Sequence, residues 1–204
     1  MTSMEEIPLF PLNAVLFPRG RLPMQIFEKR YLDLISRALR TDTGFGICLI
    51  REGGEVARTG VRQKVHRTGT YARIIDWETL PNGLLGITAE GVRKFTILEC
   101  RAQDDNLLMA RVSWSDEDDS EREPIPVDAQ SESLVQLLQQ LTNHPMIERL
   151  NLDIDYSNLR EIGWRLSELL PIPASSRQAL LEIEEPHVRI EEIERLVGSM
   201  TDQA

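Results

Sequence analysis

The chain has 204 residues, of which 41% are hydrophobic and 27% charged, and it carries a formal net charge of -10 at pH 7. This length allows one large or two small domains with a buried core. A chain this acidic is a poor partner for nucleic acid, because the neutralisation of phosphates needs clustered cations.

The sequence shows no signal for a membrane or for secretion. No apolar run approaches the roughly 20 residues that a membrane-spanning helix needs. The first residues include Glu5 and Glu6 and lack the basic start and apolar core of a signal peptide. Cys48 and Cys100 are far apart and form no C-x-x-C pair, so we expect two buried, reduced thiols. These features predict a soluble, cytoplasmic protein.

The opening segment, residues 7–35, combines four prolines with leucines and phenylalanines. Proline fixes φ and cannot donate a ladder hydrogen bond, which excludes a central strand or an uninterrupted helix here. The segment is nevertheless too apolar to lie loose in water. It predicts a rigid, extended path of edge strands and turns that packs onto a core.

The next part, up to residue 114, has the pattern of one helix followed by short strands. An apolar stripe predicts an amphipathic helix over residues 31–39, with Tyr31, Leu34, Ile35, Ala38 and Leu39 on one face. The strands are predicted at residues 45–50, 61–66, 71–77, 84–90, 92–100 and 107–114.

Two of the connections between these strands have the composition of hairpin turns. Pro81-Asn82-Gly83 contains the Asn-Gly step that suits positive φ, and Asp104-Asp105-Asn106 is a second turn signal. Short antiparallel strands of this kind predict a small barrel, which leaves no exposed sheet edge.

The composition changes at residue 116. Residues 116–123 are mostly acidic, and Pro124 and Pro126 follow, which predicts a solvated linker over residues 116–127. Beyond it the pattern is helical, with helices expected over residues 131–141, 158–170, 175–183 and 186–197. Ser175-Ser176-Arg177-Gln178 is interpreted as a capping box. We therefore expect a barrel over residues 1–115 and a bundle of about four helices over residues 128–204.

An ordered set of short motifs runs through nearly the whole chain. It comprises Pro8-Leu9-Phe10-Pro11-Leu12, Leu16-Phe17-Pro18, Leu22-Pro23, Ile26-Phe27-Glu28, Arg30-Tyr31, Glu90-Gly91-Val92-Arg93-Lys94-Phe95 and Gln178-Ala179-Leu180-Leu181-Glu182. This set resembles the LON domain, the amino-terminal substrate-interaction domain of ATP-dependent Lon proteases, which also occurs as a free-standing protein. The resemblance implies an α+β fold in which a PUA-like, mostly antiparallel barrel precedes the helical bundle. Met24 departs mildly, since the family more often has leucine there.

Two roles stay open for the side chains of the opening segment. Phe10, Phe17 and Phe27 are expected to fill the core, and Glu28 is expected to pair with Arg30. A rim of apolar residues beside the barrel would instead mark an interaction surface. The predicted polypeptide-binding residues are Pro11, Leu12, Pro18, Pro23, Met24, Glu28, Arg30 and Tyr31.

The sequence also contains one small basic cluster. On a strand, Arg62, Lys64 and His66 share one face, and Arg67 follows directly. Such a stripe either keeps one face of a sheet soluble or binds an anion, so Arg62, Lys64 and Arg67 are a possible anion site. The three histidines lack metal-ligand spacing, and the acidic run lacks the pattern of a calcium loop. We expect no metal and no cofactor.

Motifs of enzymes are missing from the sequence. No G-x-x-x-x-G-K-[ST] phosphate loop and no G-x-S-x-G elbow occurs. Nothing resembles the separate carboxy-terminal domain in which Lon proteases carry their serine–lysine pair. The sequence therefore predicts a non-catalytic protein that binds unfolded or tagged polypeptides, as an adaptor for a protease acting in trans. The alternative is a PUA-like module for RNA or a small ligand; the oligomeric state stays open.

Overall fold

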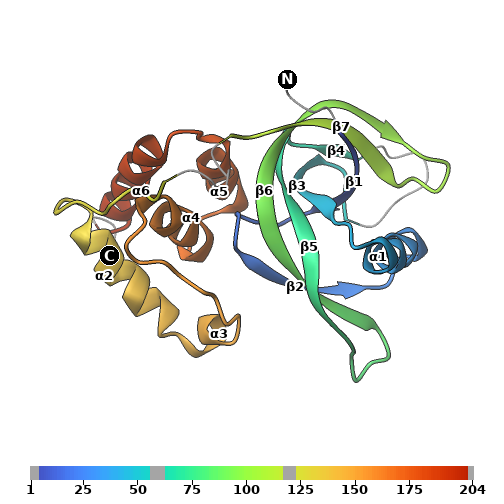
Figure 1. The fold of residues 1–204 in the computed structure, drawn as a ribbon, viewed down its shortest axis with the longest axis horizontal. Helices are drawn as coiled ribbons and strands as arrows, with labels where there is room; N and C mark the ends of the chain where they lie inside the picture. The colour runs from blue at the N-terminus through green and yellow to red at the C-terminus, as the bar shows by residue number, and fades with distance from the viewer. Residues whose placement is uncertain (1–4, 56–62, 117–122, 202–204) are drawn as a thin grey trace. The chain divides into compact units, whose positions relative to one another are not determined.

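The computed structural model describes residues 5–55, 63–116 and 123–201. The chain divides into two compact units, Met1–Asp118 and Asp119–Ala204 (Figure 1). The first unit is a mostly antiparallel sheet with one helix, and the second contains helices. This confirms a fold that combines a mostly antiparallel sheet with several helices.

The strands of the first unit pair into one sheet that returns on itself. The chain order is β1 (Glu5–Leu12), β2 (Arg21–Ile26), α1 (Lys29–Thr41), β3 (Phe45–Glu52), β4 (Lys64–Val65), β5 (Thr68–Thr79), β6 (Leu85–Ala102) and β7 (Leu108–Trp114). The pairing runs β1-β7-β6-β5-β3, and β3 pairs again with β1 in parallel, so five strands form a closed ring. β2 lies outside this ring and pairs with β6, while β4 pairs with β3.

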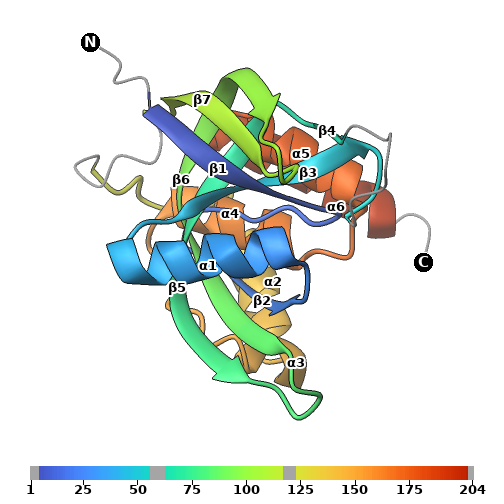
Figure 2. The same ribbon diagram turned by 90° about the vertical axis from the view of Figure 1, so that its right-hand side faces the viewer.

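Alternating side chains divide the interior into two apolar clusters. One includes Phe10, Tyr31, Ile35 and Phe45, which come from β1, α1 and β3. Figure 2 shows α1 alongside the strands of this unit. The other is built mainly on β1, β6 and β7. Its members are Ile7, Leu9, Cys48, Phe95, Ile97, Leu108, Ala110 and Val112. The predicted helix is therefore confirmed, but Leu39 is 43% exposed and does not belong to its buried stripe.

Both hairpins form where their turn residues predicted them. Gly83 has a φ of 80° between β5 and β6, and Asn106 has a φ of 65° between β6 and β7. The strands predicted on either side of Gly91 are one continuous strand, so the interruption there was wrong. Gly91 marks a close approach instead, because its N–H donates to the Gly20 carbonyl and its carbonyl accepts from the Arg19 N–H.

The second unit contains five helices within its described residues. They are α2 (Glu132–Thr142), α3 (Pro145–Glu148), α4 (Leu159–Leu169), α5 (Ala174–Glu182) and α6 (Pro186–Thr201). α4 packs against α2, α5 and α6 and is the centre of the unit. Apolar side chains from every helix except α3 are buried there, among them Leu138, Ile162, Leu181 and Ile193.

The ends of α4 and α5 show how these helices are fixed. The Asn158 side chain accepts the Arg160 N–H at 3.2 Å and caps α4. The predicted capping box at residues 175–178 is wrong, since α5 begins one residue earlier at Ala174, after Pro173, without a side-chain cap. At the other end of α5, Arg189 donates to the carbonyls of Leu180 and Ile183.

Within the described residues, no helix combines the length and the apolar character that a membrane span requires.

Candidate functional site

A cavity of about 220 Å³ lies along β2, between that strand, the end of β1 and the start of α1. We call it the β2 pocket. Apolar side chains form most of its wall, and three polar side chains complete it. It is lined by Phe10, Leu12, Ala14, Leu22, Pro23, Met24, Gln25, Ile26, Phe27, Glu28, Tyr31 and Glu55.

Two stacked aromatic rings form one wall of the β2 pocket. The rings of Phe10 and Tyr31 lie 3.9 Å apart, centroid to centroid, with their planes inclined by 14°. The guanidinium carbon of Arg30 lies 4.4 Å from the Tyr31 ring centroid, at cation–π distance. This stack joins the end of β1 to the first turn of α1.

The hydroxyl of Tyr31 is buried and has no hydrogen-bond partner within the described ranges of the chain. Burial raises the pKa of Tyr31 to about 12; the Arg30 guanidinium opposes this rise, and the carboxylates of Glu28 and Glu55 add to it. Glu28, Glu55 and Tyr31 all line the β2 pocket. A buried hydroxyl without a partner costs about 1–3 kcal/mol.

The strand beside the pocket has a free edge in the described part of the chain. β2 pairs with β6 from Arg21↔Glu90 to Ile26↔Leu85 and with no other described strand. Every residue from 22 to 28 lines the pocket, whereas a cavity on one sheet face would touch alternate residues only. The β2 pocket therefore runs along the edge of the strand.

A second hollow, of about 180 Å³, adjoins the first. Its lining shares Pro23, Met24 and Gln25 with the β2 pocket and adds residues of the β5–β6 hairpin, including Trp77 and Glu78. We call it the Trp77 hollow. Trp77 is 59% exposed and Phe27 is 58% exposed, so an exposed aromatic side chain lies at each of the two depressions. Large apolar side chains grouped in this way are typical of interaction surfaces.

The charges on the walls of these two depressions are all negative. Glu28 and Glu55 line the β2 pocket, and Asp76 and Glu78 line the Trp77 hollow. No Lys, Arg or His is among the described lining residues of either. The Glu28 carboxylate is partly neutralised by Arg30, whose Nε lies 3.1 Å away. The surface is therefore apolar with an acidic border.

The structure separates the sequence-predicted binding residues into two groups. Leu12, Pro23, Met24, Glu28 and Tyr31 come together in the wall of the β2 pocket. Their contact with a polypeptide stays a prediction.

Pro11 and Pro18 are buried, so their predicted place on an exposed rim is wrong. Pro11 lies inside β1 and pairs with Cys48 of β3, while residues Glu5–Leu9 of β1 pair with β7. β1 is therefore not the edge strand that its prolines predicted. Phe10 and Phe17 fill the core as predicted, but Phe27 faces outward, contrary to expectation.

Arg30 has a structural position rather than an exposed one. Its side chain is only 5% exposed, and it pairs with Glu28 as predicted. The guanidinium also donates to the main-chain carbonyls of Asn106 at 2.7 Å and Glu55 at 3.3 Å, and to the Gln63 side chain at 3.3 Å. These bonds tie α1 to the β6–β7 turn and to residues 55 and 63, so Arg30 holds the pocket's surroundings in place.

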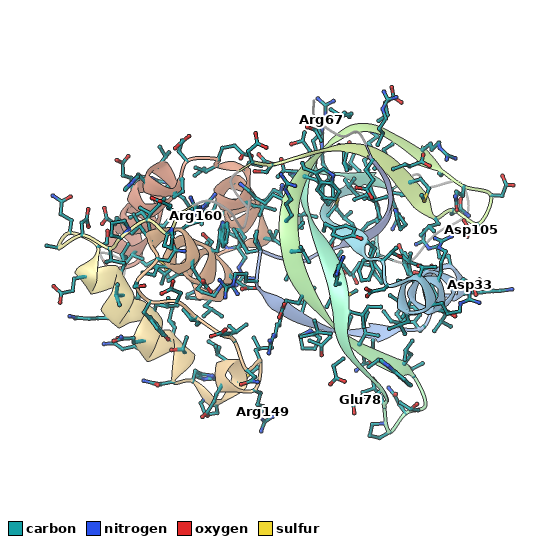
Figure 3. All side chains as sticks on the ribbon, viewed as in Figure 1. Asp33, Arg67, Glu78, Asp105, Arg149 and Arg160 are labelled. Carbon is teal, nitrogen blue, oxygen red and sulfur yellow. The ribbon has the colours of Figure 1, made fainter. Side chains whose placement is uncertain are left out.

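The predicted anion site lies elsewhere. Lys64 and Arg67 line a larger hollow of about 690 Å³, together with Arg30 and Arg101. Figure 3 shows Arg67 and Glu78 at opposite ends of the first unit. Lys64 pairs with Glu52 at 2.6 Å, and Arg101 pairs with Glu6 at 3.0 Å, which reduces the positive charge of this hollow. Arg62 lies outside the described residues.

Gln25, Phe27, Glu55 and Trp77 line the two depressions but were not predicted as residues of the site. Trp77 had a signal, because an apolar side chain next to a predicted turn, with charged neighbours, is rarely core. Glu55 had none, since its place depends on contacts far apart in the sequence. Within the described ranges, no group of three or more His, Cys, Asp or Glu side chains gathers as a metal site. Cys48 is buried, but Cys100 is exposed, which corrects the expectation that both are buried.

Comparison with known families gives one match that spans almost the entire chain. Residues 6–198 match the model of the ATP-dependent protease La (LON) substrate-binding domain. A solved structure of a Lon N-terminal domain protein from Xanthomonas campestris is 30% identical, with a TM-score of 0.74, and the match covers 94% of this chain and 98% of that one.

Curated relatives are longer proteins. A Lon protease from Xanthomonas oryzae is 25% identical over 203 residues, which are 97% of this chain and 23% of the protease. A Lon protease from Cytophaga hutchinsonii is 29% identical over 108 residues, which are 52% of this chain and 13% of the protease. The matched part is thus less than a quarter of either protease.

Proposed function

Because the chain belongs to the LON substrate-binding domain family, we propose that it is a non-catalytic module that recognises unfolded or tagged polypeptides in the cytoplasm. The proposed role is that of a substrate-binding or adaptor protein, with proteolysis carried out in trans by a separate protease. The observation that carries this proposal is the apolar, acid-bordered surface of the β2 pocket and the Trp77 hollow, which lies beside a free strand edge.

The physical reason is that an unfolded chain exposes the kinds of groups that this surface can bind. An unfolded segment exposes apolar side chains and unpaired main-chain groups. A pocket binds the former, and a strand edge binds the latter with little dependence on sequence. An apolar pocket beside a strand edge therefore suits a module that binds varied substrates, and such binding requires no catalytic group.

We also propose how the chain is divided into domains. We interpret the closed ring of strands in residues 1–115 as a PUA-like barrel, residues 116–127 as an acidic linker and residues 128–204 as a helical bundle. The closed pairing of β1 with both β7 and β3 supports the barrel. A crystal structure of the chain, superposed on PUA domains, tests it.

Binding is tested by fluorescence titration with a permanently unfolded model protein, such as one whose disulfides have been reduced and blocked. We expect saturable binding in the micromolar range, and no binding of the same model protein in its native form. The chain must show a cooperative unfolding transition in the same buffer. If this folded sample binds neither form, the proposed function is wrong.

A protease assay tests the non-catalytic part of the proposal. The purified chain, prepared from a host that lacks Lon, is expected to leave unfolded substrates intact with and without ATP. ATP-dependent cleavage by this sample would contradict it.

RNA or small-ligand binding at Lys64 and Arg67 is the alternative function. Its support is weaker, because Lys64 is paired and the whole chain carries a net charge of -10. RNA binding that weakens steeply with salt would favour the alternative, and the Arg67→Glu variant would abolish it.

A further inference from the structure

We propose that an extended polypeptide segment, apolar at alternate positions and flanked by Lys or Arg, adds to the free edge of β2 as a further strand. This inference rests on the proposed function and specifies the substrate class and binding mode of the same site. One side chain of the segment enters the β2 pocket, and its neighbour in sequence lies over the Trp77 hollow.

The main chain of β2 is suited to this addition. In an edge strand, the N–H and C=O groups of alternate residues point away from the partner strand, and a proline is tolerated where its nitrogen points outward. Pro23 in the middle of β2 therefore places its own carbonyl, and the N–H and C=O of Gln25, on the outer side. Gln25 is the residue at which an added strand can both donate and accept.

The two depressions match the alternation of a strand. Leu22 and Met24 pack against the core cluster, whereas Pro23 and Gln25 are exposed on the opposite face. A strand placed beside β2 would alternate its side chains in the same way, since successive side chains point to opposite faces. One side chain of the added strand then enters the β2 pocket along the edge, and the next points to the face of Pro23 and Gln25, which also line the Trp77 hollow.

An unpaired polar atom marks the β2 pocket as a site for a ligand. Tyr31 lines the pocket, and its buried hydroxyl has no hydrogen-bond partner among the described residues. A polar atom of the entering residue, such as its main-chain carbonyl, would accept this hydrogen bond. A solely apolar contact would leave the hydroxyl unsatisfied.

The negative charge of the two depressions favours a segment with basic residues beside its apolar positions. The lining of the two depressions carries the carboxylates of Glu28, Glu55, Asp76 and Glu78 and, among the described residues, no cation. Lys and Arg beside the apolar positions are therefore attracted, and Asp and Glu are repelled.

The test uses the full chain and a synthetic peptide in which Leu and Thr alternate between pairs of lysines. Its controls are a peptide with glutamate pairs and an N-methylated peptide that cannot pair through its main chain. Tryptophan fluorescence and calorimetry measure affinity for each peptide, and the unfolded model protein is titrated in parallel. We expect the lysine peptide to bind and both controls to bind at least about tenfold more weakly, the loss of roughly one hydrogen bond or charge contact.

Two substitutions at one position separate the main chain from the side chain. Gln25→Pro removes the outward N–H and is expected to weaken peptide binding at least about tenfold. Gln25→Ala keeps the N–H and is expected to weaken binding less than Gln25→Pro, so the difference between the two variants measures the main-chain contribution. Amide hydrogen exchange in the unmodified protein provides a measurement without a variant: the Gln25 amide should become protected when the peptide binds.

A second pair of variants tests the charge. Glu78→Lys is expected to weaken binding of the lysine peptide and to strengthen binding of the glutamate peptide. Arg67→Glu, at the other end of the unit, is expected to leave the binding of both peptides unchanged.

The outcomes distinguish this inference from the proposed function. If the chain binds unfolded protein while Gln25→Pro binds peptide normally and the Gln25 amide stays unprotected, the inference is wrong and the proposed function stands. If the chain binds no polypeptide, the proposed function fails and the inference fails with it. Sedimentation would show whether the chain forms dimers. If it does, and if Gln25→Pro abolishes them, a second copy of the chain occupies the edge of β2 and the proposal is wrong.

Discussion

Phe10 and Tyr31 stack face to face, with ring centroids 3.9 Å apart, although β1 and α1 are separated in sequence by β2. The contact fixes the first turn of α1 on the end of β1. It also shapes the β2 pocket, because both rings line it. Stability of the first unit and the shape of its candidate site therefore depend on the same pair.

The stack predicts the effect of truncating Phe10. Phe10→Ala removes a ring that is only 6% exposed, and we expect the free energy of unfolding to fall by about 3–5 kcal/mol. Phe10→Leu keeps most of the volume and should cost about half as much. Urea unfolding followed by circular dichroism measures both. Leu32→Ala, on the exposed side of α1, is the control, with a change within about 0.5 kcal/mol. Equal effects at positions 10 and 32 would contradict the assignment of Phe10 to the core.

Tyr31 predicts a loss of stability at alkaline pH. The unfolded chain releases the phenolic proton near its usual pKa of about 10, whereas the folded chain holds it until about pH 12. The folded state thus binds more protons in this window, so stability falls as the pH rises from about 10 to 12, by about 2 kcal/mol. Urea unfolding from pH 8 to 12, with Tyr31→Phe as the comparison, isolates this contribution.

The Tyr31→Phe variant should lack that decline and should also be more stable at neutral pH by about 1 kcal/mol, because it removes an unsatisfied hydroxyl. If the two proteins respond identically to pH, the tyrosine is not buried as described.

At Gly91 even one added methyl group is expected to lower the stability of the fold. A Cβ at Gly91 would overlap the carbonyl oxygen of Phe17, a main-chain atom that two nearby hydrogen bonds hold in place. We expect Gly91→Ala to cost about 2–3 kcal/mol. Gly54→Ala is the matched control, since no atom lies within 4 Å of the added Cβ. Thermal unfolding of both variants measures the difference, and a neutral Gly91→Ala would show that residues 17–20 move aside.

Features determined by neighbouring residues were predictable from the sequence. The Asn82-Gly83 step specifies a positive φ by itself, and the hairpin forms there. The stripe of α1 follows from periodicity, which needs no knowledge of the rest of the chain. The family resemblance followed from ordered motifs and is confirmed by the match over residues 6–198.

Features determined by distant contacts were not predictable in this way. Ile26 is buried and Phe27 is exposed, and a motif of apolar letters does not state which of two neighbours faces inward. Pro11 is buried where β1 pairs with β3, a pairing set by residues far along the chain. The same limit hid Glu55 and Trp77, which reach the candidate site from two other parts of the sequence.

Substitutions of Arg30 separate the contribution of its positive charge to stability from that of its planar guanidinium group. Its guanidinium contacts Glu28, the Gln63 side chain and two main-chain carbonyls, an arrangement that needs several donors in one plane. Arg30→Lys keeps the charge but not this geometry, so we expect a loss of about 1–2 kcal/mol. Arg30→Ala also leaves buried acceptors unpaired and should cost about 3 kcal/mol or more.

Arg37→Ala, on the exposed face of the same helix, is the control, with a change within about 0.5 kcal/mol. Urea unfolding ranks the three variants, and hydrogen exchange at residues 103–107 reports the β6–β7 turn. That turn should open in both Arg30 variants, because the Asn106 carbonyl accepts the shortest of the guanidinium bonds, at 2.7 Å. If Arg30→Lys matches the unmodified protein in both measurements, the charge alone stabilises this region, and the planar group is not required.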